Sequence, residues 1–180
     1  MWDLKAPRPV KLIVGILAAD HQCLHAAIET VDSKLGKVDL ESDVWLFDHT
    51  DYYKEQTGET IWRQFVSVEP LLDPGKLAAI KRKTNKLEQK LASRLALSVP
   101  RPVNLDPGII EPSKLVLATT KNYSHRIYIG KKMYAEVTLI YDKGHWRPFE
   151  YTYPDYRQPQ YHDFFEKVRT RLVEQLQSLH

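Results

Sequence analysis

The stretch Val10-Lys-Leu-Ile-Val-Gly-Ile-Leu17 is an apolar run that contains several β-branched residues. A run of this kind predicts a central strand that is buried on both faces of a sheet. Asp20 is placed to cap a following helix, and apolar residues recur at helical spacing from Leu24 to Leu35 before Gly36. The fold is therefore expected to begin with a buried strand followed by a helix.

Further along the chain, apolar patterning predicts strands at residues 44–47 and 61–68, separated by a polar and aromatic loop at 48–58. Asp73-Pro74 is typical of a helix start, because the carboxylate caps the first turn and proline fits the first helical position. The apolar positions of residues 77–95 share one face, which predicts a long helix.

Pro100 and Pro102 end this helix, and residues 103–105 are expected to form a fourth strand. The resulting order is β-α-β-β-α-β. It predicts an α+β fold with a ferredoxin-like core, in which two helices cover one face of an antiparallel sheet. An added antiparallel hairpin and a C-terminal helix complete the expected architecture.

The added elements are strands at residues 114–119, 125–129 and 133–141 and a helix that starts near Pro159. The second and third of these strands form a hairpin around Gly130-Lys-Lys132. A three-residue loop would place Tyr128 opposite Tyr134 and Arg126 opposite Glu136, with Ile127, Ile129, Val137 and Leu139 on the other face. A two-residue loop would shift the pairing by one residue and lose these pairs.

The composition predicts one domain over residues 1–180, of the soluble globular class. No apolar segment is long enough for a membrane span, and the N-terminus has no secretory signal pattern. The single cysteine, Cys23, fits a reducing cytoplasm. The net charge is +3, yet residues 76–101 hold eight Lys or Arg and only Glu88 as an acid, so the basic charge is concentrated in the second helix.

Asn104-Leu-Asp-Pro-Gly108 follows the fourth strand, and Pro107 and Gly108 suit the two central positions of a type II turn. One interpretation is a rigid turn and nothing more. The other is a carboxylate, Asp106, held at a strand end beside Asn104, where it suits a hard divalent cation.

Lys121-Asn-Tyr-Ser-His-Arg126 gathers two cations, a hydroxyl, an amide and an imidazole in one connection. Lys121, Ser124 and Arg126 together suit a phosphate or carboxylate, with Tyr123 beside them. The imidazole side chain is a common general acid or base in enzymes, which makes His125 a candidate for that role. The plain alternative is a polar hairpin edge on which Arg126 pairs with Glu136.

Three further groups of polar residues are candidates, each with a structural alternative. Asp48, His49 and Asp51 lie in the tyrosine-rich loop, Arg157 and Asp155 precede the last helix, and Lys81, Asn85 and Glu88 align along one helix flank at positions i, i+4 and i+7. The flank residues either face the sheet edge and join the polar cluster or pair with one another. Glycine-rich phosphate loops, C-x-x-C and G-x-S-x-G are absent from the sequence.

Five ordered motifs carry a resemblance to a known family: Phe47-Asp-His-Thr-Asp-Tyr-Tyr53, Thr84-Asn-Lys-Leu-Glu88, Asn104-Leu-Asp-Pro-Gly108, Ala118-Thr-Thr-Lys-Asn-Tyr-Ser-His-Arg-Ile-Tyr128 and Thr152-Tyr-Pro-Asp-Tyr-Arg157. Together they resemble a bacterial family of unknown function, DUF4416, over nearly the whole chain from Val10 to the last helix. The resemblance implies a bacterial cytosolic protein with a single domain. It implies no activity.

The residues favour a pocket for a phosphorylated small molecule, such as a nucleotide. Its expected ligand-binding residues are Lys121, Tyr123, Ser124, Arg126, Arg157, Asp48 and Asn104. Asp106, Asp48 and Glu136 are the candidate ligands of a Mg²⁺ or Mn²⁺ ion. If the protein is an enzyme, metal-assisted phosphoryl transfer or hydrolysis fits, with His125, Asp106 and Glu136 as the catalytic candidates. The alternative is a non-catalytic module that binds RNA or an acidic protein through the basic helix 76–94.

Overall fold

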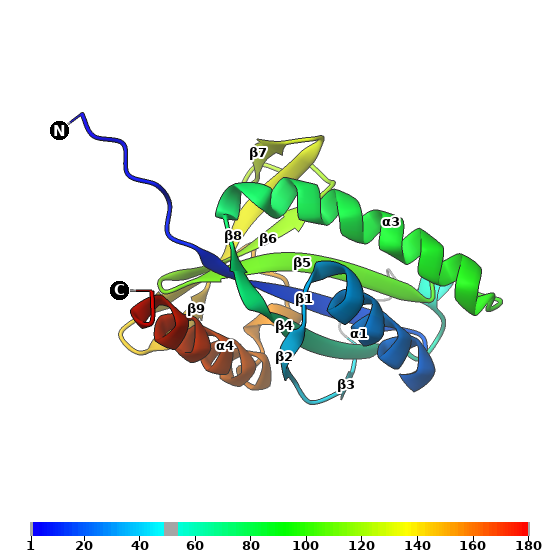
Figure 1. The fold of residues 1–180 in the computed structure, drawn as a ribbon. Helices are drawn as coiled ribbons and strands as arrows, with labels where there is room; N and C mark the ends of the chain where they lie inside the picture. The colour runs from blue at the N-terminus through cyan, green and yellow to red at the C-terminus, as the bar shows by residue number, and fades with distance from the viewer. Residues whose placement is uncertain (1, 49–53, 180) are drawn as a thin grey trace.

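In the computed structural model, which describes residues 2–48 and 54–179, helices pack on one large antiparallel sheet (Figure 1). The strands in the described residues are β1 (Val10–Ala18), β2 (Val38–Glu41), β3 (Trp45–Leu46), β4 (Trp62–Leu72), β5 (Val103–Glu111), β6 (Lys114–Thr119), β7 (Ile127–Gly130), β8 (Met133–Asp142) and β9 (His145–Pro148). The α-helices are α1 (His21–Leu35), α2 (Lys54–Thr57), α3 (Leu77–Leu95) and α4 (Pro159–Gln177). No helix among the described residues has the length and apolar character needed to cross a bilayer.

The central position of β1 is confirmed. The strand order is β2-β4-β1-β5-β6-β8-β7, with β3 paired to β4 and β9 paired to β8, and every pair is antiparallel. All nine residues of β1 are buried. A strand with neighbours on both sides and helices on both faces has to be apolar almost throughout, which is the pattern seen in its sequence.

The α+β class is confirmed, but the sheet is larger than the sequence predicted. Nine strands exceed a simple ferredoxin-like sandwich with one added hairpin. The strand predicted at residues 44–47 is present as the shorter strand β3, whereas β2 and β9 were not predicted. The predicted loop at residues 48–58 contains the short helix α2. β2 and β9 have four residues each, which is too little alternation to be recognised from sequence.

Alternate residues of β1 serve two separate cores. Leu12, Val14 and Ile16 pack with apolar residues of α1 and α3, which cover one face of the sheet (Figure 1). Ile13 points the other way and packs with Phe65 of β4 and the aromatic residues of α4. Because successive side chains of a strand alternate between faces, one buried strand organises both layers.

For the hairpin of β7 and β8, the predicted cross-strand pair is correct and the predicted loop length is wrong. The loop has two residues rather than three, with Lys131 and Lys132 at φ 54° and 62°. Tyr128 nevertheless pairs with Tyr134 as predicted, because the register shifts by one residue between Tyr128 and Gly130. A bulge can absorb the missing loop residue in this way.

The turn predicted at Asn104–Gly108 is wrong, because this segment lies inside β5 and pairs with β1 throughout. Gly108 has a packing role there. A Cβ atom at this position would lie 2.6 Å from Cδ2 of Leu117 and 2.8 Å from the carbonyl oxygen of Val116. Glycine is therefore required for β6 to approach β5 closely.

We expect Gly108→Ala to lower the free energy of unfolding by about 1–3 kcal/mol, because the methyl group would force a backbone shift between β5 and β6. Urea unfolding followed by circular dichroism would measure this change. Gly75→Ala is the matched control, since its Cβ would meet only the flexible Asp73 side chain. An equal loss of stability in both variants would contradict this role for Gly108.

Candidate functional site

The sheet opens between β5 and β6. The two strands pair only from Gly108–Leu117 to Glu111–Lys114, although β5 begins five residues earlier at Val103. In β5 the backbone of Leu105 faces away from β1, toward β6, as its hydrogen bonds show. By the alternation of an antiparallel strand, Pro107 faces the same way. Proline has no N–H to donate, so the β5–β6 ladder stops there and the strands diverge.

Side chains of α3 occupy the place that β6 leaves. The Lys81 ammonium donates to the carbonyl oxygen of Leu105 at 3.1 Å, and a Glu88 carboxylate oxygen accepts from the N–H of Leu105 at 2.8 Å. Lys81 and Glu88 are both buried and lie two helical turns apart on the same flank. The sequence left two interpretations of this flank, in which its residues either face the sheet edge or pair with one another. The structure shows that they face the sheet edge.

A cavity of about 1060 Å³ fills the space between the diverging strands. One wall is the flank of α3, and the others come from β5, β6, Glu136 of β8 and the segment 153–156. Of the residues predicted to bind the ligand or a metal or to act in catalysis, this cavity brings together four, Asn104, Asp106, Lys121 and Glu136. It is also lined by the further candidates Lys81, Asn85, Glu88 and Asp155.

A chain of polar contacts links five of the residues that line the cavity. Arg101 binds the carboxylate of Glu88 at 2.6 Å and also donates to the side-chain oxygen of Asn104. The Asn104 amide donates to Asp106 at 2.6 Å, and Lys81 donates to the other carboxylate oxygen of Asp106 at 3.0 Å. Arg101 and Asp106 keep 33% and 29% of their side-chain surface exposed, whereas Lys81 and Glu88 are almost fully enclosed.

The two acids of this chain have opposite pKa shifts. Burial raises the pKa of Glu88, and its neighbours Arg101 and Lys81 only partly offset this effect. Burial acts in the same direction on Asp106, but there Lys81 and Arg63 outweigh it and lower the pKa. Asp106 is therefore a firmly ionised carboxylate that remains open to the cavity.

Arg63 closes the inner end of the cavity. Its guanidinium is buried and donates to Asp155 at 2.7 Å, while it lies against the rings of Phe47, Phe65 and Tyr156. Among the residues that the structure describes, its Nε and Nη1 atoms find no hydrogen-bond acceptor, and three aromatic rings lie against the cation instead. Asp155, which was a candidate from the segment before the last helix, therefore forms its ion pair with Arg63 of β4.

The predicted cluster at residues 121–126 is divided by the structure. Lys121 lines the cavity, whereas His125 and Arg126 hold Glu136 from outside it. His125 Nε2 lies 3.1 Å and Arg126 Nε 2.8 Å from the same oxygen of Glu136, and Arg126 also donates to the hydroxyl of Tyr153 at 2.6 Å. The predicted cross-strand contact of Arg126 with Glu136 is therefore present.

Other predicted residues lie elsewhere. Tyr123, Ser124 and Asp48 are exposed and are not part of the cavity lining. Arg157 donates to the backbone carbonyls of Glu150 and Thr152, so its side chain stabilises the loop that precedes it in the chain. His49 and Asp51 lie outside the described residues.

Within residues 2–48 and 54–179, no group of three or more His, Cys, Asp or Glu residues is arranged to hold a metal ion. The candidate triad Asp48, Asp106 and Glu136 is therefore not gathered into a site. Two of its members are instead engaged by cations, since Asp106 pairs with Lys81 and Glu136 pairs with Arg126.

Sequence reasoning missed Arg63, Arg101 and Tyr153 as parts of this site. One signal was available for Arg63, because a cation inside an otherwise apolar predicted strand has to find a partner. The identity of that partner, Asp155, could not be predicted, since it is 92 residues away in the chain.

Comparison with known families places the chain beside one described only by its unknown function. A family model described as "Domain of unknown function (DUF4416)" matches residues 8–172. Searches of curated proteins and of solved structures find no match.

We expect Lys81→Met to destabilise the protein at pH 7 by roughly 3 kcal/mol, because it leaves Asp106 without its ion-pair partner and the carbonyl of Leu105 without a donor. Lys86→Met removes an exposed lysine from the same helix and should change stability by less than about 0.5 kcal/mol. Chemical unfolding of both variants measures the difference.

The loss in Lys81→Met should shrink on acidification. The pKa of Asp106 is lowered in the folded wild type, so its contribution is present above the ordinary pKa of an aspartate and is lost as the pH falls through the folded value. Without Lys81 this contribution is already missing. Unfolding measured from pH 7 down to well below the ordinary pKa of an aspartate should therefore narrow the difference in stability between the two proteins, and a constant difference would exclude the ion pair as its cause.

Proposed function

The chain belongs to the DUF4416 family, and from the geometry of its cavity we propose that it binds a phosphorylated small molecule, such as a nucleotide, between β5, β6 and α3. The observation that carries this proposal is the exposure of Arg101 and Asp106 inside a cavity whose other charged groups are mostly paired and enclosed.

A purely structural role does not account well for this arrangement. Ion pairs formed by Lys81, Glu88, Arg63 and Glu136 meet around one cavity. Removing such charges from water is costly, and apolar residues that filled the space would often be at least as stabilising. Concentrations of buried and oriented charge of this kind are typical of ligand sites.

The cations favour an anionic ligand. Arg101 is the partly exposed cation inside the cavity, and its planar guanidinium is well suited to a phosphate. Lys121 adds an exposed ammonium from the β6 side. Tyr153, which is 41% exposed, offers an aromatic surface at the same site on which a ring of the ligand can stack.

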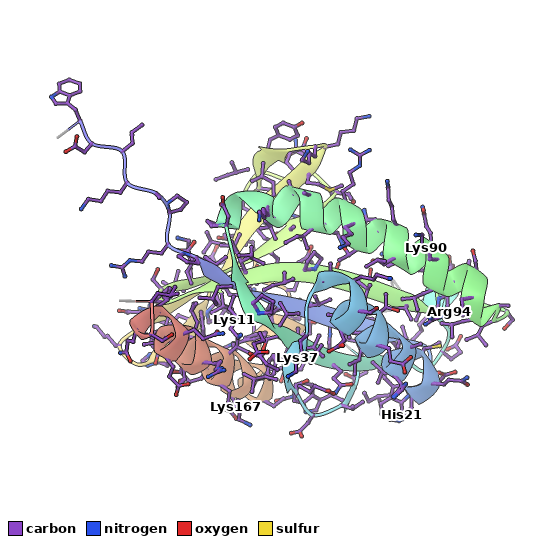
Figure 2. All side chains as sticks on the ribbon, viewed as in Figure 1. Lys11, His21, Lys37, Lys90, Arg94 and Lys167 are labelled. Atoms are coloured by element: carbon purple, nitrogen blue, oxygen red, sulfur yellow. The ribbon has the colours of Figure 1, made fainter. Side chains whose placement is uncertain are left out.

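The basic face of α3 adjoins the cavity and supports the same proposal. Lys86, Lys90 and Arg94 line a shallow surface of this helix together with Gln89 and Ser93, and the last two also line the cavity. Figure 2 shows Lys90 and Arg94 on α3. A positive field beside the entrance raises the local concentration of an anion and speeds its association.

The finer points of the sequence analysis remain proposals. We propose that the unit from β1 to β5 is a ferredoxin-like core to which the later strands were added, and that the protein works in a bacterial cytoplasm, where the buried Cys23 stays reduced. Metal-assisted phosphoryl transfer or hydrolysis stays a prediction. The cavity supports binding directly through its cations, without a metal step.

The second candidate is an RNA-binding or protein-binding module. The specific observation in its favour is the row of exposed cations on α3, Lys83, Lys86 and Lys90, which could contact a phosphate backbone. Aromatic residues that would stack with bases are missing from this helix, so the small-molecule proposal has more support.

For the first candidate, we expect AMP or ribose 5-phosphate to stabilise the protein, by roughly 2.7 kcal/mol at one hundred times its dissociation constant. Lys121→Gln should weaken binding about tenfold, because a charge-assisted contact to the phosphate is lost. Lys131→Gln, at the tip of the β7–β8 hairpin and outside the cavity lining, is the matched control. Titration calorimetry measures both variants, and equal affinities would argue against the cavity as the binding site.

The two candidates can be separated by Lys86→Gln/Lys90→Gln. If the ligand binds in the cavity, this double variant should change the dissociation constant of AMP by no more than about threefold and reduce its salt dependence. If RNA is the partner, binding of a short single-stranded RNA should fall by more than an order of magnitude, since each contact with a phosphate releases counterions. Fluorescence anisotropy at two salt concentrations distinguishes these outcomes.

A further inference from the structure

We infer that the ligand carries hydroxyl groups beside its phosphate, as sugar phosphates and nucleotides do, and that Asp106 accepts a hydrogen bond from one of them. This inference rests on the proposed function and names the class of compound that the cavity selects.

The first argument is that a cation and an anion lie on either side of the same amide group in the cavity lining. Arg101 and Asp106 both contact the same amide, Asn104, which accepts from the guanidinium and donates to the carboxylate. Both charged side chains keep about a third of their surface open. A ligand that fits this surface needs an acceptor at the Arg101 end and a donor within a few bonds of it.

The second argument is the free accepting capacity of Asp106. One oxygen accepts from Lys81 and the other from Asn104, yet an ionised carboxylate has about four acceptor positions. Asp106 lines the cavity and keeps 29% of its side-chain surface exposed, so it has both the capacity and the access to accept a further hydrogen bond. The lowered pKa keeps the group an acceptor rather than a donor at neutral pH.

The third argument concerns the kind of donor. Lys81 is bonded directly to Asp106, and Arg63 lies close enough to lower its pKa as well, so the negative charge is already compensated. A second ammonium group would meet these cations, whereas a hydroxyl donates without adding charge. The phosphate itself is repelled by Asp106 and is directed to Arg101, which fixes the orientation of the ligand.

Fixed geometry should make this contact selective. Asp106 is held from two sides by partners that are themselves held, since Lys81 also bonds the backbone of β5 and Asn104 also bonds Arg101. When a ligand without the hydroxyl displaces water from this rigid acceptor, the remaining acceptor positions of Asp106 lose a hydrogen bond that nothing replaces. Sites built in this way discriminate strongly against analogues that lack the donating group.

The test varies the ligand and leaves the protein intact. Calorimetric titrations of the wild-type protein would compare glycerol 3-phosphate with propyl phosphate, and AMP with 2′,3′-dideoxy-AMP. We expect the hydroxylated member of at least one pair to bind about tenfold tighter or more, because hydrogen bonds to ionised groups are the strong ones. Equal affinities within both pairs would overturn the inference and leave the proposed function standing.

A variant then assigns the effect to Asp106. Lys81→Met/Asp106→Leu removes both partners of the ion pair, so that neither charge is left buried alone. We expect this variant, once thermal unfolding shows that it is folded, to bind the two members of the discriminating pair with affinities within about threefold of each other. Retained discrimination would exclude Asp106 as the acceptor.

Two further outcomes are decisive. Failure of inorganic phosphate, AMP, ribose 5-phosphate and glycerol 3-phosphate to bind at all would overturn the proposed function together with this inference. Tighter binding of phosphoethanolamine than of glycerol 3-phosphate would show that the site prefers an ammonium group, which would overturn the hydroxyl assignment alone.

Discussion

The backbone of Leu105 is the constraint on which the rest of the site depends. A buried strand edge with unpaired N–H and C=O groups is costly, so a sheet normally opens only at its rim. Here Pro107 stops the ladder to β6, and Lys81 and Glu88 of α3 bond the two orphaned groups instead. The gap is thereby stable without a neighbouring strand, and it leaves room for a cavity at the middle of the sheet.

Using charged side chains for this purpose has consequences for the whole site. Each charge brought to the gap needs a partner, and Asp106 and Arg101 provide them. A second buried lysine, Lys11, lies between the sheet and α4 and provides a contrast with this site (Figure 2). Its ammonium donates to Asp39, to the carbonyl of Val68 and to Gln175, and Lys11 has no exposed surface. A closed network of that kind ties α4 and β2 to the sheet, whereas the open network at Asp106 retains surface with which a ligand can interact.

Local sequence signals predicted most of the long elements correctly. The Asp20 cap, the Asp73-Pro74 helix start and the Tyr128–Tyr134 pair are all present in the structure. Each depends on residues only a few positions apart, so periodicity and capping chemistry are sufficient to find it. The short strands β2 and β9 were missed because they are held mainly by pairing with a longer neighbour, which no local pattern records.

The sequence by itself determined that the stretch from Val10 to Leu17 is a buried central strand, because an apolar run of this kind is stable only where both of its faces are covered. It also determined which segments carry polar chemistry. Only the tertiary structure decided that Asn104–Gly108 is strand rather than turn, since pairing with β1 overrides the local preference of a Pro-Gly pair. Only the tertiary structure decided that Asp106 faces a cavity and that Arg157 bonds the backbone of a loop. Those outcomes depend on partners far away in the chain, whose positions are set by how the layers pack.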